Sequence, residues 1–181
     1  MTDADGANQP LVPDSGMIAA FAAVLFRYAL GVQPVPDRPL LPPRRGREIE
    51  VRLFLQPDPV LTAAELTPAI IAYRFDQGAV CFGAFKGGSF VGCLWVCLGP
   101  YEEDEVRCRF VPLPAQKSCW DLGMYIAPDQ RGGLVFARLW DEANAYLRQR
   151  GVKWTLSRIG IANMSSLGSP ARIRARRLAT A

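Results

Sequence analysis

Residues 126–140 read IAPDQRGGLVFARLW, and this stretch decides the fold. The apolar residues up to Ile126 complete a strand, the following turn carries Arg131 and two glycines, and Leu134 opens an amphipathic helix. Such a turn leaves backbone N–H groups unpaired, and the first turn of a helix adds a positive partial charge. Because glycine has no side chain, a ligand can come close to the backbone there. The stretch therefore predicts a strand–turn–helix unit that binds a phosphate.

The elements around this unit follow an order typical of a mixed α/β domain. Apolar and alternating patterns predict strands at 48–55, 79–85, 90–98, 106–111, 118–126 and 152–159. Helical patterns predict helices at 17–30, 62–75 and 134–149, and a loop with a final helix at 163–178. This order predicts a central, mostly antiparallel sheet with one parallel pair, flanked by helices.

The chain divides into an arm and a domain. Residues 1–46 predict a flexible N-terminal arm, which holds the apolar 17–30 helix and a proline-rich connector. Residues 47–181 predict the folded domain. Within it, the acidic run at 102–105 predicts an exposed loop, whose alternative role is to attract a cationic amine.

Composition excludes several kinds of chemistry. The 181 residues include no histidine, which removes the commonest metal ligand and the usual general base. The five cysteines form no C-x-x-C pair, so we expect free thiols, no metal site and a reducing, cytoplasmic setting. The apolar 17–30 segment is too short to span a bilayer, so we expect no stable membrane insertion.

The net charge of +4 conceals a basic C-terminal segment. Residues 143–181 hold eight Lys or Arg and no Asp or Glu, which leaves 13 basic and 17 acidic residues elsewhere. This charge fits contact with a phosphate, and a solvated helix face is the alternative. Because no aromatic residues are interleaved with the arginines at 172–177, we expect no nucleic-acid partner.

The element order and the 126–140 stretch resemble the GNAT superfamily of acyl-CoA N-acyltransferases. In that family a strand ends in a V-x-P-like sequence, and a turn of pattern Q/R-x-x-G-x-G/A binds the pyrophosphate of acetyl-CoA. Here Ile126-Ala127-Pro128 matches the strand end, and Arg131-Gly132 matches the turn. The resemblance covers residues 48–178 and implies the GNAT fold.

The resemblance also implies a cofactor, a reaction and a set of binding residues. The cofactor is acetyl-CoA or another acyl-CoA, with an acyl-carrier protein as the alternative donor, and the acyl group passes directly to a small-molecule or protein amine. Asn163 and Ser166 match an N-x-x-S/A motif near the last helix of the family. The implied cofactor-binding residues are Met124, Ile126, Gln130, Arg131, Gly132, Gly133, Leu134, Asn163 and Ser166.

Several positions depart from the family pattern. Whether Gln130 or Arg131 opens the turn motif, the sixth position is Val135 or Phe136 instead of a small residue. Pro170 stands where the family often has a tyrosine that protonates the departing thiolate. The last two strands of the family sheet have no sequence to form them, so we expect a truncated C-terminus or a homodimer through an open sheet edge.

Two residues near the strand end are candidates for catalysis. Acyl transfer needs a positioned neutral amine and a donor for the carbonyl oxygen, and backbone N–H groups at 124–126 can supply that donor. Without histidine, a carboxylate is the expected general base, and Asp121 lies on the strand that enters the turn. Burial would raise the pKa of this carboxyl, whereas a structural ion pair with Arg107 or Arg109 is the alternative. Tyr125 is the candidate for protonating the leaving thiolate.

A second interpretation is a catalytically weak or inactive GNAT-like module that binds a ligand or a protein partner. The altered turn, the absent tyrosine and the missing terminal strands favour it.

Overall fold

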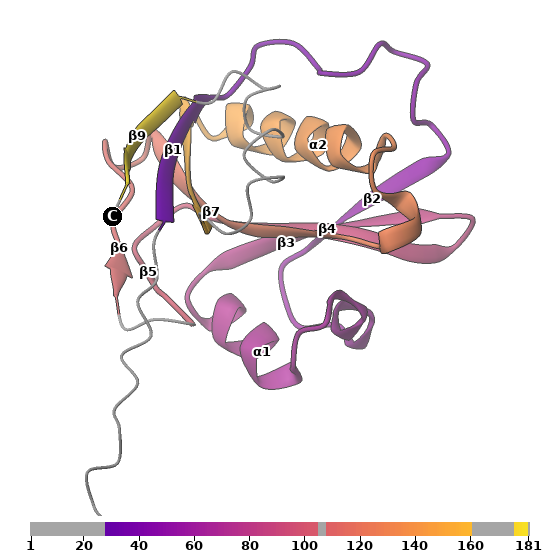
Figure 1. Ribbon diagram of the computed structural model, residues 1–181, viewed down its shortest axis with the longest axis horizontal. Helices are drawn as coiled ribbons and strands as arrows, with labels where there is room; N and C mark the ends of the chain where they lie inside the picture. Colours follow the sequence, from indigo (N-terminus) through magenta and orange to yellow (C-terminus); the bar gives the residue numbers. More distant parts are fainter. Residues whose placement is uncertain (1–27, 105–107, 161–175, 181) are drawn as a thin grey trace, which may run out of the picture.

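The computed structural model describes residues 28–104, 108–160 and 176–180. Seven strands form the main sheet in the order β2-β3-β4-β7-β8-β1-β9. Only β7 and β8 run parallel among these neighbours, which confirms the predicted mostly antiparallel sheet with one parallel pair. Figure 1 shows α2 over one face of the sheet and α1 below the other.

The strands are β1 Tyr28–Pro34, β2 Ile49–Phe54, β3 Ala79–Lys86, β4 Ser89–Cys97, β5 Tyr101–Glu102, β6 Arg109–Phe110, β7 Ser118–Ile126, β8 Trp154–Gly160 and β9 Arg176–Thr180. The helices are η1 Pro59–Ala64, α1 Pro68–Asp76, η2 Pro128–Gln130 and α2 Val135–Gln149.

Local signals account for the hairpin and the helix ends. Gly87 and Gly88 join β3 to β4 with φ of 57° and 83°, values that suit a two-residue hairpin turn. Thr67 caps α1, because its hydroxyl accepts a hydrogen bond from the N–H of Ile70 at 3.3 Å. Gly151 follows α2 with φ of 75°, as a helix-ending glycine should. These elements are confirmed close to their predicted bounds.

The core lies on both faces of the sheet. One cluster fills the space under α2 and includes Val96, Leu139 and Ala143. The other lies under η1 and α1 and includes Leu61, Ile71, Cys93, Trp95 and Trp120. Residues of β4 alternate between the two clusters, so this strand is buried on both sides.

The N-terminal segment differs from the prediction. Residues 28–30 lie in β1 instead of a helix, and residues 17–27 of the predicted helix lie outside the described residues. β1 runs antiparallel along β8, from Tyr28 opposite Gly160 to Pro34 opposite Trp154, and β9 pairs with the far side of β1. The open sheet edge that we expected therefore does not lie along this side of β8, because β1 supplies the backbone partners that an edge strand lacks.

The connector at 35–48 is anchored to α2, so the prediction of a flexible arm is wrong for it. The buried Asp141 carboxylate accepts hydrogen bonds from the N–H groups of Leu40 at 2.5 Å and Leu41 at 3.2 Å. Arg148 donates to the carbonyl of Pro36 at 2.6 Å. Side chains of α2 thus accept from the connector's N–H groups and donate to one of its carbonyls, where no neighbouring strand among the described residues does so.

Two further predicted elements are corrected. Of the strand predicted at 106–111, residues 106 and 107 lie outside the described residues. Among the rest, only Arg109 and Phe110 are in a strand, β6, which pairs with β5 in a separate two-stranded sheet. Residues 176–178 of the predicted final helix lie in β9, and residues 161–175 lie outside the described residues.

Gly92 sets the distance between β4 and the end of β7. A Cβ at this position would lie 2.6 Å from the carbonyl oxygen of Tyr125 and 3.3 Å from a methyl group of Val135. Real Cβ atoms do not approach backbone oxygens so closely, so only glycine lets β4, β7 and the start of α2 meet in this way. The sequence reading did not single out this residue.

We expect Gly92→Ala to destabilise the fold by roughly 1–3 kcal/mol, because the added methyl must push strand backbone aside. Urea unfolding followed by circular dichroism measures this change. Gly99→Ala is the matched control, since a Cβ at Gly99 meets nothing within 4 Å. Equal midpoints for the two variants would contradict the close approach.

Candidate functional site

The two parallel strands separate halfway along β7. Pairing of β7 with β8 begins at Ser118 opposite Trp154 and stops at Asp121 opposite Ser157, whereas β7 continues to Ile126. Across β7, β4 stays paired throughout. In the described part of the chain, the β8-facing side of residues 122–126 therefore has no strand partner.

A β-bulge marks the point of separation. Val96 of β4 lies opposite Asp121, and the preceding Trp95 lies opposite Gly123, so Leu122 is an extra residue in β7. Gly123 has φ of 129°, a conformation that side chains rarely allow, and its N–H donates to the Asp121 carboxylate at 2.9 Å. The bulge redirects β7 away from β8 while β4 follows it.

The separated strand end offers backbone donors. The N–H of Ala127 donates to the carbonyl of Val91, which makes this a hydrogen-bonded antiparallel pair. Because such pairs alternate, the N–H groups of Met124 and Ile126 point away from β4, toward the side that β8 has left. The amide of Tyr125 faces β4 instead. Of the three predicted backbone donors at 124–126, those of Met124 and Ile126 therefore point into the opening between β7 and β8.

The turn after β7 keeps its amides available. Within the described residues, no acceptor pairs with the N–H groups of Gly132 or of residues 134–137. No acidic residue occupies the first turn of α2, and no side chain caps it. Arg131 is exposed, and its Nε donates to the carbonyl of Ile126 at 3.2 Å. The arrangement fits a phosphate group.

The bulky sixth motif position does not obstruct this turn. With Gln130 as the first position, the sixth is Val135, whose side chain is 1% exposed and packs under α2 near Gly92. Its side chain is therefore part of the core. With Arg131 as the first position, the sixth is Phe136, which is half-buried and packs against the same cluster.

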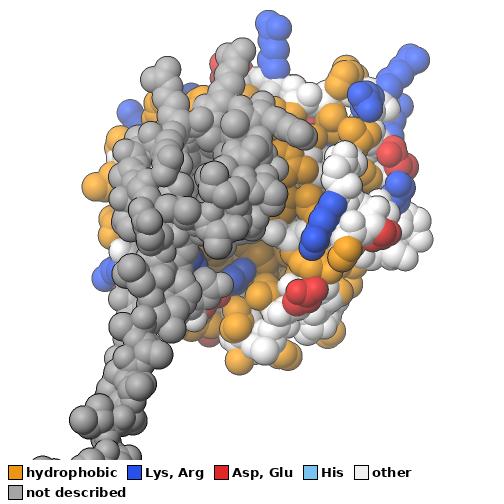
Figure 2. Space-filling model, viewed as in Figure 1, with side chains coloured by type: hydrophobic (Ala, Val, Ile, Leu, Met, Phe, Trp, Pro, Cys, Tyr) orange, Lys and Arg blue, Asp and Glu red, His pale blue; other side chains and the backbone are white. Residues whose placement is uncertain are grey.

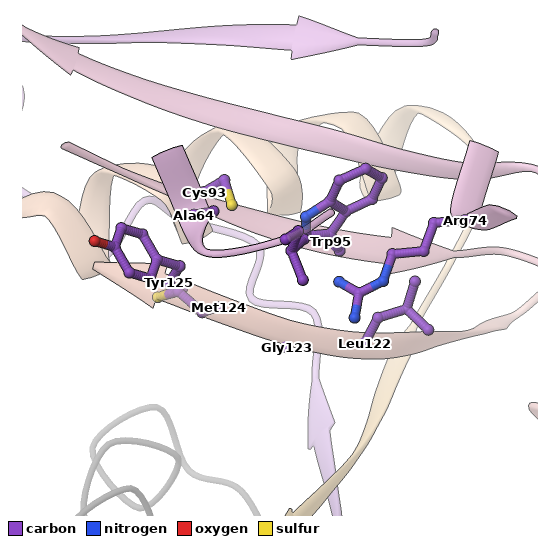
Figure 3. Close-up of a pocket in the computed structure, with 9 residues that line it drawn as sticks. Ala64, Arg74, Cys93, Trp95, Leu122, Gly123, Met124 and Tyr125 are labelled. Carbon is purple, nitrogen blue, oxygen red and sulfur yellow. The ribbon is translucent and has the colours of Figure 1, made fainter. Parts of the chain in front are cut away.

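A pocket of about 220 Å³ lies on the α1 face of the same strand (Figure 3). It runs along β7 from Arg74 and Leu122 at one end to Tyr125 at the other. Among the described residues that line it, Arg74 alone is charged. The lining residues are Ala64, Leu66, Arg74, Cys93, Trp95, Leu122, Gly123, Met124 and Tyr125.

The two candidate catalytic residues lie on opposite faces of the sheet. Tyr125 pairs with Cys93 in the α1-side core, lines the pocket and stacks on Phe90 with ring centroids 6.5 Å apart. Asp121 pairs with Val96 of the α2-side core and does not line the pocket. The structure thus brings Tyr125, but not Asp121, to the pocket.

The environment of Asp121 changes its protonation. Packed protein atoms desolvate the carboxyl and raise its pKa to about 7, and the hydrogen bond from the Gly123 N–H lowers it by a smaller amount. Among the described residues it has no ion pair, and the predicted alternative partner Arg109 pairs with Glu102 at 3.4 Å. A carboxyl with this pKa can take up and release a proton near neutral pH.

The acidic run at 102–105 is not the exposed loop that we predicted. The side chain of Glu103 is 4% exposed and pairs with Arg158 at 2.7 Å. The side chain of Asp104 is 7% exposed and pairs with Arg74 at 2.8 Å. Two arginines from other elements neutralise these carboxylates, so neither attracts a cationic amine from solvent. Only Glu102 of the three described acidic residues is solvent-exposed.

Sequence reasoning missed the charged residue of the pocket. Arg74 follows an apolar helical pattern and carries no local motif, so nothing near it in sequence marks it. Asn163 and Ser166, which the family resemblance implies for the cofactor, lie outside the described residues. Gln130, Gly133 and the other predicted turn residues lie together between β7 and α2.

The structure also describes the state of the cysteines and the possible metal ligands. All five cysteines are free; four are buried and Cys108 is half-buried. No group of residues in the described ranges could hold a metal ion.

On the face seen in Figure 2, the Lys and Arg side chains of the described residues are scattered instead of gathered in one patch. None of the helices in 28–104, 108–160 or 176–180 has the length and apolar character needed to cross a bilayer.

Comparison with known proteins identifies the fold. No family model matches the chain, and a search of curated proteins finds no match. Solved structures do match: a tandem GNAT protein from the clavulanic acid biosynthesis pathway has a TM-score of 0.58 at 11% identity, over 87% of this chain and 52% of that one. A GNAT-family acetyltransferase from Colwellia psychrerythraea has a TM-score of 0.54 at 11% identity, over 86% of this chain and 54% of that one.

A third structure is smaller. An aminoglycoside acetyltransferase from an uncultured soil metagenomic sample has a TM-score of 0.51 at 8% identity, over 71% of this chain and 89% of that one. The chain therefore has the fold of the GNAT acetyltransferases. It spans about half the length of the other two structures, at 52% and 54%.

Replacing Asp121 tests its altered pKa through protein stability. An unfolded chain releases this proton near pH 4, whereas the folded chain holds it up to about pH 7. Between those values only the folded state binds the proton, so the free energy of unfolding falls as pH rises. Asp121→Asn keeps the acceptor for Gly123 and cannot ionise. From about pH 4 to about pH 8 the variant should gain on the order of 4 kcal/mol relative to the wild type, because the pKa differs by about three units.

Urea unfolding at several pH values measures this difference. Asp129→Asn is the control, since it makes the same acid-to-amide change at an exposed position. A pH-independent difference for Asp121→Asn would show that the carboxyl titrates normally.

Proposed function

We propose that the protein is an N-acyltransferase that moves an acyl group from acetyl-CoA or another acyl thioester directly to an amine. The observation that carries this proposal is the end of β7, where three features meet. Its unpaired N–H groups face the opening beside β8, it leads into a turn with free amides, and it forms one wall of the pocket. The GNAT fold of the chain supports the same reaction class.

The turn would hold the diphosphate of the cofactor. The free amides of Gly132 and Leu134, the helix N-terminus and the exposed Arg131 provide hydrogen bonds and positive charge on one side of the chain. Gln130 and Gly133 complete this turn. A bound acyl thioester would supply an activated acyl carbon. The N–H groups of Met124 and Ile126 would donate to its carbonyl oxygen.

Tyr125 and Asp121 would handle protons at different places. The Tyr125 side chain lines the pocket, so its hydroxyl is our candidate for donating a proton to the departing sulfur. Asp121 lies on the α2 side of the separated strand, with its carboxylate held by the Gly123 N–H. With a pKa of about 7 it stays our proposed general base. Because it lies on the opposite face of the sheet from the pocket, it would receive the proton of the amine through an intervening group and not by direct contact. Asn163 and Ser166 stay proposed cofactor residues.

Two further proposals concern the setting of the protein. Five unpaired thiols favour a reducing compartment such as the cytoplasm. A homodimer stays a proposal, although the β8 edge is not available for it. In the described sheet the outer strands are β2 and β9.

Titration calorimetry with CoA and acetyl-CoA tests the cofactor site. We expect binding by the wild type and about tenfold weaker binding by Arg131→Ala at low salt, because a charged contact with phosphate is lost. Arg150→Ala is the matched control: this exposed arginine follows the opposite end of α2 and should not matter. No heat at millimolar cofactor, or equal affinities for wild type and Arg131→Ala, would count against the proposal.

A further inference from the structure

The pocket on the α1 face contains a positive group prepared for a ligand. Arg74 reaches from α1 toward the middle of the pocket, beside Trp95 and Leu122 (Figure 3). Its side chain is 11% exposed, and its guanidinium carbon lies 5.4 Å from the centroid of the Trp95 ring. A buried, stacked guanidinium cannot move freely, so its donors are aimed before any ligand arrives.

Asp104 holds one edge of this guanidinium and leaves the other available. Both Nε and Nη2 of Arg74 contact the same oxygen, Oδ2 of Asp104, at 2.9 Å and 2.8 Å. Among the described residues, Nη1 has no hydrogen-bond partner. Asp104 itself does not line the pocket. Arginine offers five N–H donors in a planar fork, so a second carboxylate can bind on the free edge.

Trp95 forms the wall next to this guanidinium. Its indole N–H is fully buried, so this donor faces packed protein and not the pocket. Arg74 is therefore the donor that a ligand can reach, and no carboxylate is among the described residues that line the pocket. These two features define a site for an anion.

The remaining walls limit the size and character of the ligand. Leu66, Leu122 and Ala64 are apolar, and about 220 Å³ is less than the space that drug-sized ligands occupy. Tyr125 and the backbone of Met124 stand at the end opposite Arg74. A small molecule with an anionic group at one end and an amine at the other would therefore span the pocket.

We propose that the acyl acceptor is a small, amino-acid-like amine whose carboxylate binds Arg74, with its amine directed toward Tyr125 and Met124. This inference rests on the proposed acyl transfer. In that reaction the amine nitrogen forms an amide bond with the acyl carbon, the thioester C–S bond breaks, and a proton lost by the nitrogen is balanced by one gained by the sulfur. The product is an N-acyl amino acid and a free thiol.

Direct binding tests the carboxylate preference without any turnover. The probes are β-alanine, 4-aminobutyrate, 5-aminopentanoate and 6-aminohexanoate, whose carboxylate and amine stand at opposite ends of the molecule. Each is compared with its carboxamide, which keeps the amine and the chain but removes the negative charge. Calorimetry with the full chain should show at least one amino acid binding about tenfold more tightly than its amide, as expected for a lost charged hydrogen bond. Equal binding within every pair, or no binding of any amino acid, would overturn the inference.

Variants connect the preference to Arg74. Arg74→Gln should abolish the difference between acid and amide, whereas the exposed Arg109→Gln should keep it. If circular dichroism shows that Arg74→Gln is unfolded, Arg74→Lys is used: it keeps the charge but not the planar fork, and the preference should fall without disappearing. A preference that survives either folded variant unchanged would assign the carboxylate to another group.

CoA titration separates this inference from the proposed function. Arg74→Gln should bind CoA like the wild type, because Arg131 and the turn lie beyond the other end of β7. Binding of CoA without any carboxylate preference would overturn the acceptor class alone. A carboxylate preference without CoA binding would overturn acyl transfer, and the acceptor assignment with it, while leaving an anion-binding pocket.

Discussion

The structure depends on the interruption of one β-ladder. β7 leaves β8 after Asp121, because Leu122 is an extra residue opposite β4 and Gly123 takes a backbone conformation that few other residues accept. A bulge bends its strand and increases the local twist. The result is a strand end with N–H groups that no described neighbour satisfies, although buried backbone donors are normally paired. Gly92 keeps β4 close enough to support this strand end from its other side.

Two buried ion pairs hold the α1 side of the site in place. Arg74 and Arg158 come from α1 and β8, and they meet the adjacent carboxylates of Asp104 and Glu103. Removing such charges from water offsets much of their attraction, so these pairs contribute more to geometry than to net stability. They fasten the segment after β5 to two separate elements. The same contact that immobilises Arg74 leaves one of its edges directed to the pocket.

The separation of β7 from β8 also divides the chemistry between two faces. Directly opposite residues of paired strands share a face, which places Asp121 on the α2 side and Tyr125 on the α1 side. The turn with free amides follows residue 126, at one end of the β7 segment 122–126. Arg74 lies in the pocket near the other end, beside Leu122. A cofactor and an acceptor can approach this segment separately, which suits a direct transfer between two bound molecules.

The amino-acid sequence by itself determined the local elements of this protein. Gly87-Gly88 defined the hairpin, the apolar stripe and Gly151 defined α2, and the residues around Arg131 defined the turn. Each of these signals acts over a few residues, through backbone conformation or helical periodicity. They were sufficient to predict a mostly antiparallel sheet with one parallel pair.

Only the tertiary structure decided which strands pair and which side chains come into contact. The pairing of β1 with β8 joins residues more than a hundred positions apart, and no local pattern distinguished it from a helix. The acidic run looked solvated because its arginine partners lie on other elements. The extra residue in β7 reversed the side-chain alternation, so Asp121 and Tyr125, four positions apart, face opposite ways. Burial and pairing depend on contacts that are distant in sequence, and these place Arg74 beside Trp95 in the pocket.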